Sequence, residues 1–184
     1  MRYFYDTEFL EDGKTIELIS IGIVADDGRE YYAVNSEAPW DRIRDDDWLM
    51  DNIVRHLPTH STGQVRENKT FGARSKYSWG GVDCKSVLVK PKWVIRNEVR
   101  EFLLHGGIPE LWAWYGAYDH VVLAQLFGRM INLPNGIPMW TNDLKQEHYR
   151  LGEPELPAQA EGEHNALEDA RQLKRRFDYL RGSE

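Results

Sequence analysis

The N-terminal stretch of the chain constrains the fold more than any other part. Three segments, residues 2–9, 15–25 and 29–35, are rich in the aromatic and β-branched residues that favour β-strands. The two connections between them, Glu11-Asp12-Gly13 and Asp26-Asp27-Gly28, end in glycine and are typical of tight turns. The sequence therefore predicts a three-stranded antiparallel meander.

The rest of the chain alternates a strand with helices. A buried strand is predicted at 110–115, and helices are predicted at about 46–56, 91–105, 118–127, 142–150 and 165–180. A strand followed almost at once by a helix is typical of α/β proteins. We therefore expect an α/β fold with a mixed central β-sheet, antiparallel over its first three strands and flanked by α-helices.

Length and composition limit the class of protein. The 184 residues fit one domain, and 41% hydrophobic residues exclude a disordered chain. A single cysteine excludes a disulfide framework and a cysteine-based zinc site. No apolar run approaches the roughly 20 residues of a membrane helix, and no signal region is evident, so we expect a cytoplasmic protein without a membrane partner. The net charge of −7 argues against binding nucleic acid through overall charge.

Residues 58–90 differ from their surroundings. They are rich in Ser, Gly, Thr, Lys and Arg and have no sustained periodicity, which predicts a long loop or insertion within the single domain 1–184. Residues 66–100 carry nine basic and three acidic side chains. Two interpretations stay open: an arm that attracts a phosphate backbone, with Tyr77 or Trp79 available for stacking, or a solvated loop.

Two carboxylates interrupt the aromatic first strand. Asp6 and Glu8 are two residues apart, so strand alternation places both on one face with Cα atoms about 6.6 Å apart. Adjacent like charges on a strand are destabilising unless something compensates them, and a buried pair needs a cation or a shared proton. The alternative is an edge strand with both carboxylates in solvent. Asp-x-Glu alone does not decide between them.

Two further carboxylates and a histidine stand at helix starts. Asp119 is in the first turn of the helix at 118–127, where an acidic residue is common because of the helix dipole. Its place after the C-terminal end of a strand favours a ligand-binding role instead. Asp169 lies on or beside the apolar stripe of the last helix, and His164 precedes it by five residues. Such a histidine is commonly a cap, but beside carboxylates it is a candidate general base.

Together these residues indicate a chemistry. Asp6, Glu8, Asp119 and Asp169 can offer oxygen ligands, which suit Mg²⁺ or Mn²⁺ rather than zinc. Two such ions about 3.5–4 Å apart can stabilise the attacking and leaving oxygens of a phosphoryl displacement, and His164 could take the proton of the water. The pattern predicts phosphodiester hydrolysis with two divalent metal ions.

The three segments also carry a family resemblance. Asp6-Thr7-Glu8, Tyr115-Gly116-Ala117-Tyr118-Asp119 and the His-x4-Asp pair His164 and Asp169 resemble, in order and spacing, the motifs of the DEDDh 3′–5′ exonucleases. That superfamily includes ribonuclease T, oligoribonuclease and proofreading subunits, and it has an RNase H-like fold. The sequence is most similar to a small actinobacterial, mycobacterial-type group of RNase T-like 3′–5′ exoribonucleases. The resemblance covers most of the chain and weakens between about Asn35 and Lys90.

The resemblance implies a role for each matching residue. Asp6 would bridge both metals, Glu8 and Asp169 would complete the metal sites, and Asp119 would hold the second metal directly or through water. His164 would activate the attacking water. Phe9 would contact the terminal base, and the backbone near Thr7 and Glu8 would contact the terminal ribose. The implied substrate-binding residues are Thr7, Glu8, Phe9, Ser20, Trp114 and His164. Core packing is the alternative for Phe9 and Trp114.

The implied activity is a metal-dependent 3′–5′ exoribonuclease that releases nucleoside 5′-monophosphates from single-stranded RNA or a 3′ overhang, as a homodimer. One alternative is the same chemistry on DNA, since the motifs do not discriminate the two substrates. A binding module that has lost catalysis is disfavoured because all five site residues are present. A glycosidase that uses a carboxylate pair would leave Asp119 and His164 without a role.

Overall fold

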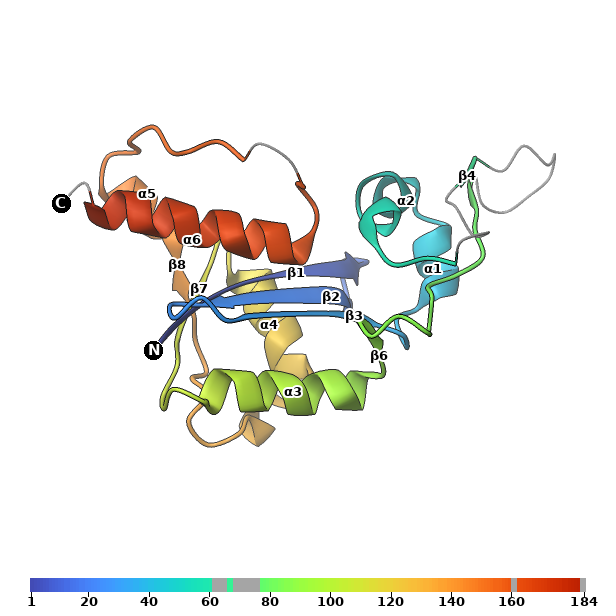
Figure 1. Ribbon diagram of the computed structural model, residues 1–184, viewed down its shortest axis with the longest axis horizontal. Coiled ribbons are helices and arrows are strands. Elements are labelled where there is room, and N and C mark those ends of the chain that lie inside the picture. The colour runs from blue at the N-terminus through green and yellow to red at the C-terminus, as the bar shows by residue number, and fades with distance from the viewer. Residues whose placement is uncertain (61–65, 68–76, 160–161, 183–184) are drawn as a thin grey trace.

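The computed structural model describes residues 1–60, 66–67, 77–159 and 162–182 (Figure 1). Its main sheet has six strands in the order β6-β3-β2-β1-β7-β8. The strands β1 (Arg2–Glu11), β2 (Ile16–Ala25) and β3 (Glu30–Asn35) are antiparallel. The other three strands are β6 (Val89–Lys90), β7 (Glu110–Ala113) and β8 (Asn142–Asp143). They pair in parallel with β3, β1 and β7, respectively. The predicted mixed sheet is confirmed, and it is consistent with an RNase H-like fold.

Helices cover both faces of the sheet (Figure 1). The helices α3 (Lys92–Leu104) and α4 (Ala117–Gln125) lie on one face, and α6 (Ala166–Gly182) lies on the other. The remaining elements are α1 (Trp40–Arg44), α2 (Asp47–Asn52), α5 (Leu144–Arg150), the 3-10 turns η1 (Val54–His56) and η2 (Met130–Asn132), and the pair β4 (Arg66–Glu67) and β5 (Tyr77–Ser78). No helix among the described residues is long and apolar enough to cross a membrane.

Strand alternation divides the side chains of β1 between the two faces. Tyr3 and Tyr5 belong to the core under α3 and α4, with Ile95 and Val99 among the buried residues there. Phe4 belongs to the core under α6, where it packs against Phe177. Asp6 and Glu8 follow Phe4 in the same alternation, so both carboxylates point to the α6 side.

The start of α6 lies directly on the sheet because β2 carries a glycine there. A Cβ atom added to Gly22 would be 2.3 Å from the backbone carbonyl carbon of Ala166, closer than real Cβ contacts allow. Gly22 is also the β2 partner of Asp6. Only glycine at this position lets the first turn of α6 reach the part of β1 that carries the carboxylates.

Three elements differ from the sequence prediction. The helix expected at 46–56 is divided into α2 and η1, and α1 precedes it. The strand expected at 110–115 ends at Ala113, and Asn142-Asp143, expected in a helix, pair in parallel with Trp112 and Ala113. This pairing between distant segments is tertiary, so local periodicity could not reveal it. Much of the loop expected at 58–90 lies outside the described residues.

Candidate active site

Three carboxylates converge at the end of α6 nearest α2. Asp6 and Glu8 of β1 and Asp169 of α6 each offer one oxygen, and these three oxygens lie within 4.8 Å of one another. They line a cavity of about 310 Å³ together with Asp119 and His164. The structure therefore brings all five predicted site residues, from three distant segments, into one place.

Asp119 reaches the cavity from α4, on the opposite face of the sheet. The backbone N–H and the hydroxyl of Thr7 both donate to Asp119 Oδ1, at 2.9 and 2.6 Å. Alternation points Thr7 away from its neighbours Asp6 and Glu8 and toward α4, which explains the contact. Thr7 lines the cavity, but both of its donors are engaged by Asp119. Its direct contribution is to hold Asp119.

The turn that places Asp119 is held by a residue from the neighbouring strand. The carboxylate of Asp143 accepts hydrogen bonds from the backbone N–H groups of Tyr115 and Gly116, both at 3.2 Å. Tyr115 has a φ of 56°, an uncommon value for a residue other than glycine. Asp143 stabilises this strained turn at the start of α4, and so it fixes where Asp119 can lie.

The segment before α6 orients Asp169 and His164. The side chain of Asn165 accepts from the N–H groups of Leu167 and Glu168, at 3.1 and 3.3 Å, and so caps the helix. His164, with a φ of 65°, turns the chain into this cap. Gln159 Nε2 donates to Asp169 Oδ1 at 2.7 Å. The ring of Trp48 meets the ring of His164 edge-on, with centroids 5.2 Å apart.

The electrostatics of the cavity favour a bound cation. Burial, followed by the charges of its acidic neighbours, raises the pKa of Asp6 well above the ordinary value and that of Glu8 to about 8. Burial raises the pKa of Asp119 to about 6, although hydrogen bonds from Thr7 act in the opposite direction. Burial also raises the pKa of Asp169. No lysine or arginine is among the described residues that line the cavity. These oxygens therefore fit hard divalent cations, which would replace the missing positive charge.

An aromatic pair forms one wall of the cavity. The rings of Phe9 and Tyr118 are stacked, with centroids 5.9 Å apart and planes 10° from parallel. A β-bulge between Glu8 and Phe9 changes the alternation of β1 at this point, so both residues can line the cavity. Tyr118 is 57% exposed, which leaves ring surface available to a ligand. The wall offers a stacking surface for a planar group.

The predicted substrate residues divide into two groups. Phe9 and Trp114 line the cavity, as do Thr7, Glu8 and His164. Ser20 does not: it is the β2 partner of Glu8 and is 0% exposed, so its side chain has no access to a ligand in this structure. The cavity lining therefore gives no support to a direct substrate contact at Ser20, which stays a prediction. Its burial follows from its central place between two paired strands.

Several residues of the site carried no clear signal in the sequence. Asp143 holds the turn that precedes Asp119, and Gln159 holds Asp169, through the hydrogen bonds given above. Each comes from a segment of unremarkable composition. Trp48 lies in the cavity lining with half of its surface exposed. Tyr118 could have been found, because it directly precedes Asp119 at the start of a helix.

Comparison with known proteins agrees with the class of enzyme that this fold and site indicate. Residues 1–180 match the family model described as the 3′-5′ exoribonuclease Rv2179c-like domain, so the chain belongs to this family of 3′–5′ exoribonucleases. The enzyme class predicted from the sequence is confirmed at the level of the family.

Individual relatives give the same result. The chain is 44% identical over 179 residues to the 3′-5′ exoribonuclease Rv2179c of Mycobacterium tuberculosis strain ATCC 25618 / H37Rv. This alignment covers 96% of the chain and 91% of the relative. The 3′-5′ exoribonuclease MT2234.1 of strain CDC 1551 / Oshkosh matches with the same identity and coverage. The predicted similarity to a mycobacterial group is confirmed.

Proposed function

We propose that this protein is a metal-dependent 3′–5′ exoribonuclease that removes nucleoside 5′-monophosphates from single-stranded RNA or from a 3′ overhang. The observation that carries the proposal is the convergence of the Asp6, Glu8 and Asp169 oxygens within 4.8 Å, in a cavity that also holds Asp119 and His164. Membership of an exoribonuclease family supports RNA rather than DNA as the substrate.

The acidic residues would hold two divalent ions, Mg²⁺ or Mn²⁺, in a site of the DEDDh type. Asp6, Glu8 and Asp169 would be direct ligands, and Asp119 would complete the second site directly or through water. Such ions lower the pKa of bound water and stabilise the attacking and leaving oxygens of a phosphodiester. The raised pKa values of the carboxylates support this assignment, because a cation would offset the burial and the charge repulsion that raise them.

The protein's own residues would orient the substrate and move the proton. His164 would accept the proton of the attacking water, whose oxygen forms a new bond to phosphorus while the bond to the upstream 3′-oxygen breaks. Gln159 would keep Asp169 in place through its hydrogen bond. Phe9 and Tyr118 would contact the terminal base. The products would be a nucleoside 5′-monophosphate and RNA shortened by one nucleotide.

Digestion of a 3′-overhang duplex and of matched single-stranded RNA and DNA oligomers tests the proposal. We expect a ladder shortened from the 3′ end of RNA with Mg²⁺ or Mn²⁺, and no cleavage with EDTA. Asp6→Asn and Asp169→Asn proteins, purified free of host nuclease, should have a kcat lower by at least about a thousandfold. Full activity of either variant would exclude the proposed site. Faster cleavage of the DNA oligomer would assign the activity to DNA.

We also propose that the protein is cytoplasmic and acts as a homodimer. The segment between α4 and β8 exposes the large apolar side chains of Met130, Ile131, Met139 and Trp140, and exposed apolar groups of this kind are frequent at contacts between subunits. Sedimentation should give twice the chain mass of 21.5 kDa. A mass of one chain at micromolar concentration would exclude the dimer.

A further inference from the structure

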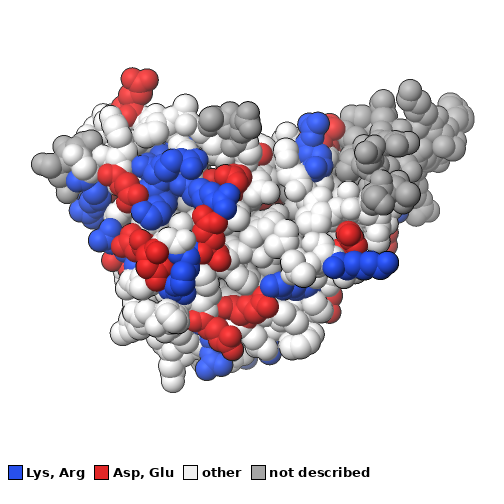
Figure 2. Space-filling view, viewed as in Figure 1, with Lys and Arg blue, Asp and Glu red and all other residues white. Residues whose placement is uncertain are grey.

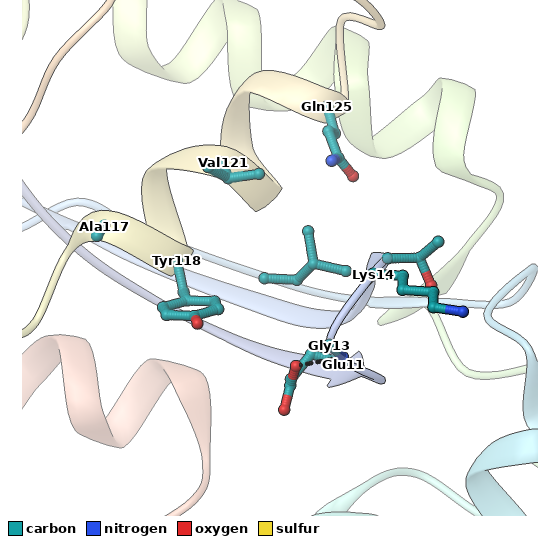
Figure 3. A pocket seen from close by; sticks show the side chains of 9 residues that line it. Glu11, Gly13, Lys14, Ala117, Tyr118, Val121 and Gln125 are labelled. Atoms are coloured by element: carbon teal, nitrogen blue, oxygen red, sulfur yellow. Dashed lines mark hydrogen bonds between the residues drawn. The ribbon is translucent and has the colours of Figure 1, made fainter.

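A second cavity adjoins the active site on the other side of Tyr118. It has a volume of about 440 Å³, and Tyr118 lines both this cavity and the acidic one. Helix α4 forms one side with Tyr118, Val121 and Gln125 (Figure 3). The end of β1 and the turn that follows it form the other side with Glu11, Gly13 and Lys14. Because the three α4 residues are spaced by three and four positions, they share one helix face.

We propose that this cavity binds the nucleotide immediately upstream of the 3′-terminal one in single-stranded RNA. The inference rests on the proposed exoribonuclease function. The acidic cavity, at about 310 Å³, is near the lower limit of about 300 Å³ for ligand pockets and provides room for one nucleotide. The next nucleotide must then lie outside it. The cavity that shares Tyr118 is an adjoining space of sufficient volume, and described residues line it.

The chemistry of the lining suits a nucleotide. Ile16 is partly buried against the core and gives an apolar floor, while Tyr118 and Val121 are 57% and 44% exposed and give an apolar wall. Any of the four bases can stack on such a surface. The amide of Gln125 offers a donor and an acceptor to the edge of a base. The ammonium of Lys14 offers one positive charge to a phosphodiester.

The turn that carries Lys14 is held firmly in place. Asp12 Oδ1 accepts from the N–H groups of Lys14 and Thr15 at 3.0 and 2.7 Å, and Glu11 Oε2 accepts from Gly13 N–H at 2.9 Å. Arg42 of α1 donates to Asp12 and to Glu17 at 2.6 and 2.7 Å, and so fastens the turn from outside. The cavity is therefore formed before RNA binds. The Glu11 carboxylate disfavours a phosphate on its own side, so the phosphate belongs near Lys14.

The experiment distinguishes binding in the second cavity from binding in the acidic cavity by comparing two ligands. A 12-nucleotide single-stranded RNA spans both, whereas a nucleoside 5′-monophosphate, the expected product, occupies only the acidic cavity and acts as a competitive inhibitor. A Val121→Trp protein, in which the indole fills the second cavity, should show a KM for the RNA at least about fivefold above wild type, since stacking of one base supplies this much. The inhibition constant of the monophosphate should be unchanged.

Two further variants keep the test independent of folding defects. Lys14→Met should reduce the slope of log KM against log salt concentration by about 0.7, the value for one phosphate contact of a single strand. Gln125→Leu should change the relative KM values of the four homopolymers, whereas Gln146→Leu, at an exposed glutamine of α5, should not.

Two results with Val121→Trp would overturn the proposal. One is an unchanged KM for RNA, and the other is an equal change in the KM and in the inhibition constant of the monophosphate. A wild-type protein that cleaves no RNA with either metal would instead overturn the proposed function itself.

Discussion

Several residues of the acidic cavity adopt charge placements or backbone angles that are energetically unfavourable on their own. Glu8 is buried and Asp6 partly buried beside Asp169, and the pKa values of Asp6 and Glu8 are raised first by burial and then by neighbouring acidic charges. His164 and Tyr115 adopt positive φ angles next to two of the carboxylate-bearing helices. Unfavourable backbone angles and buried charges of this kind cluster at functional sites.

His164 allows the role of base to be separated from that of ligand. A His164→Ala protein should have a kcat lower by about 10² to 10⁴, the usual contribution of a general base, while Mg²⁺ affinity measured by calorimetry stays within about threefold. The same variant removes the ring that packs against Trp48, so a Trp48→Phe protein serves as the control for packing. Loss of Mg²⁺ binding in His164→Ala would make the histidine a ligand or a scaffold residue.

The buried carboxylates also predict how stability depends on pH without metal. The pKa of Glu8 is raised from 4.5 to about 8, so between these values the folded protein binds more protons than the unfolded chain. Stability in EDTA must then fall as pH rises. His56 and His120 have lowered pKa values and act in the opposite direction near their ordinary pKa of 6.5. Comparison with a Glu8→Gln protein removes their contribution, because both proteins contain these histidines.

We expect the wild-type Tm in EDTA to fall, relative to Glu8→Gln, by at least about 4 °C between pH 5 and pH 8. One pKa unit corresponds to about 1.4 kcal/mol, and 1 kcal/mol lowers the Tm of a chain of this size by about 2–4 °C. Differential scanning fluorimetry at fixed ionic strength measures the difference. Parallel pH profiles for the two proteins would show that Glu8 does not titrate as its burial requires.

At the scale of elements, the site depends on where α6 begins. Gly22 of β2 and the cap at Asn165 place the first turn of α6, and therefore Asp169, beside Asp6. On the other face, Asp143 fixes the start of α4, and therefore Asp119. Each carboxylate from a helix is thus positioned by a residue in a different strand.

Substitution of Gly22 tests this dependence. In a Gly22→Ala protein the new Cβ would lie 2.3 Å from the Ala166 backbone, so α6 must move. We expect a loss of stability of about 1–3 kcal/mol, as in other overpacked cores, and a larger loss of kcat because Asp169 and His164 move with the helix. Gly182→Ala, where the added Cβ meets nothing within 4 Å, is the matched control. Wild-type Tm and kcat for Gly22→Ala would contradict the role given to the glycine.

The sequence predicted those parts of this arrangement that have a local period or a motif. The three N-terminal strands, the strand at 110, α3, α4 and α6 all follow from alternation, turn residues and apolar stripes. The parallel pairing of Asn142-Asp143 with β7 and the hydrogen bond from Gln159 to Asp169 join distant segments, and neither leaves a local pattern. After Asn35, α1 was not predicted, and the single helix predicted at 46–56 is divided into α2 and η1, since these short elements are held by their shared core rather than by periodicity.

At the scale of the molecule, charge is unevenly distributed. Figure 2 shows basic side chains gathered over α6, with acidic side chains beside them. Arg171 pairs with Glu30 at 2.5 Å and also with Glu168, and Lys174 pairs with Asp178 at 2.7 Å. Arg175 donates instead to Gln172, and the guanidinium of Arg176 lies over the ring of Trp114. The basic residues at 66–76, which lie largely outside the described residues, are further candidates for contact with a long RNA.

The described ends of this basic segment indicate how to remove it. Thr59 and Val82 form an antiparallel bridge, and the rings of Trp40 and Trp79 lie 5.4 Å apart against a core cluster. Residues up to 60 and from 77 onward must therefore be kept. Replacement of residues 61–76 by a short Gly/Ser linker removes four basic residues and one acidic residue, namely Arg66, Lys69, Arg74, Lys76 and Glu67. The fold should tolerate this change, because loop length affects stability only weakly.

We expect this deletion to raise the KM for a 40-nucleotide RNA several-fold. It should also flatten the salt dependence by about 0.7 in log–log slope for each phosphate that the protein no longer neutralises. The inhibition constant of a nucleoside 5′-monophosphate should be unchanged, because the acidic cavity is intact. A full-length protein with the four basic residues changed to Gln separates charge from length, and it should reproduce the effect. If both proteins keep the wild-type KM and salt slope, the segment is a solvated loop, and RNA is held by the acidic site and its adjoining cavity alone.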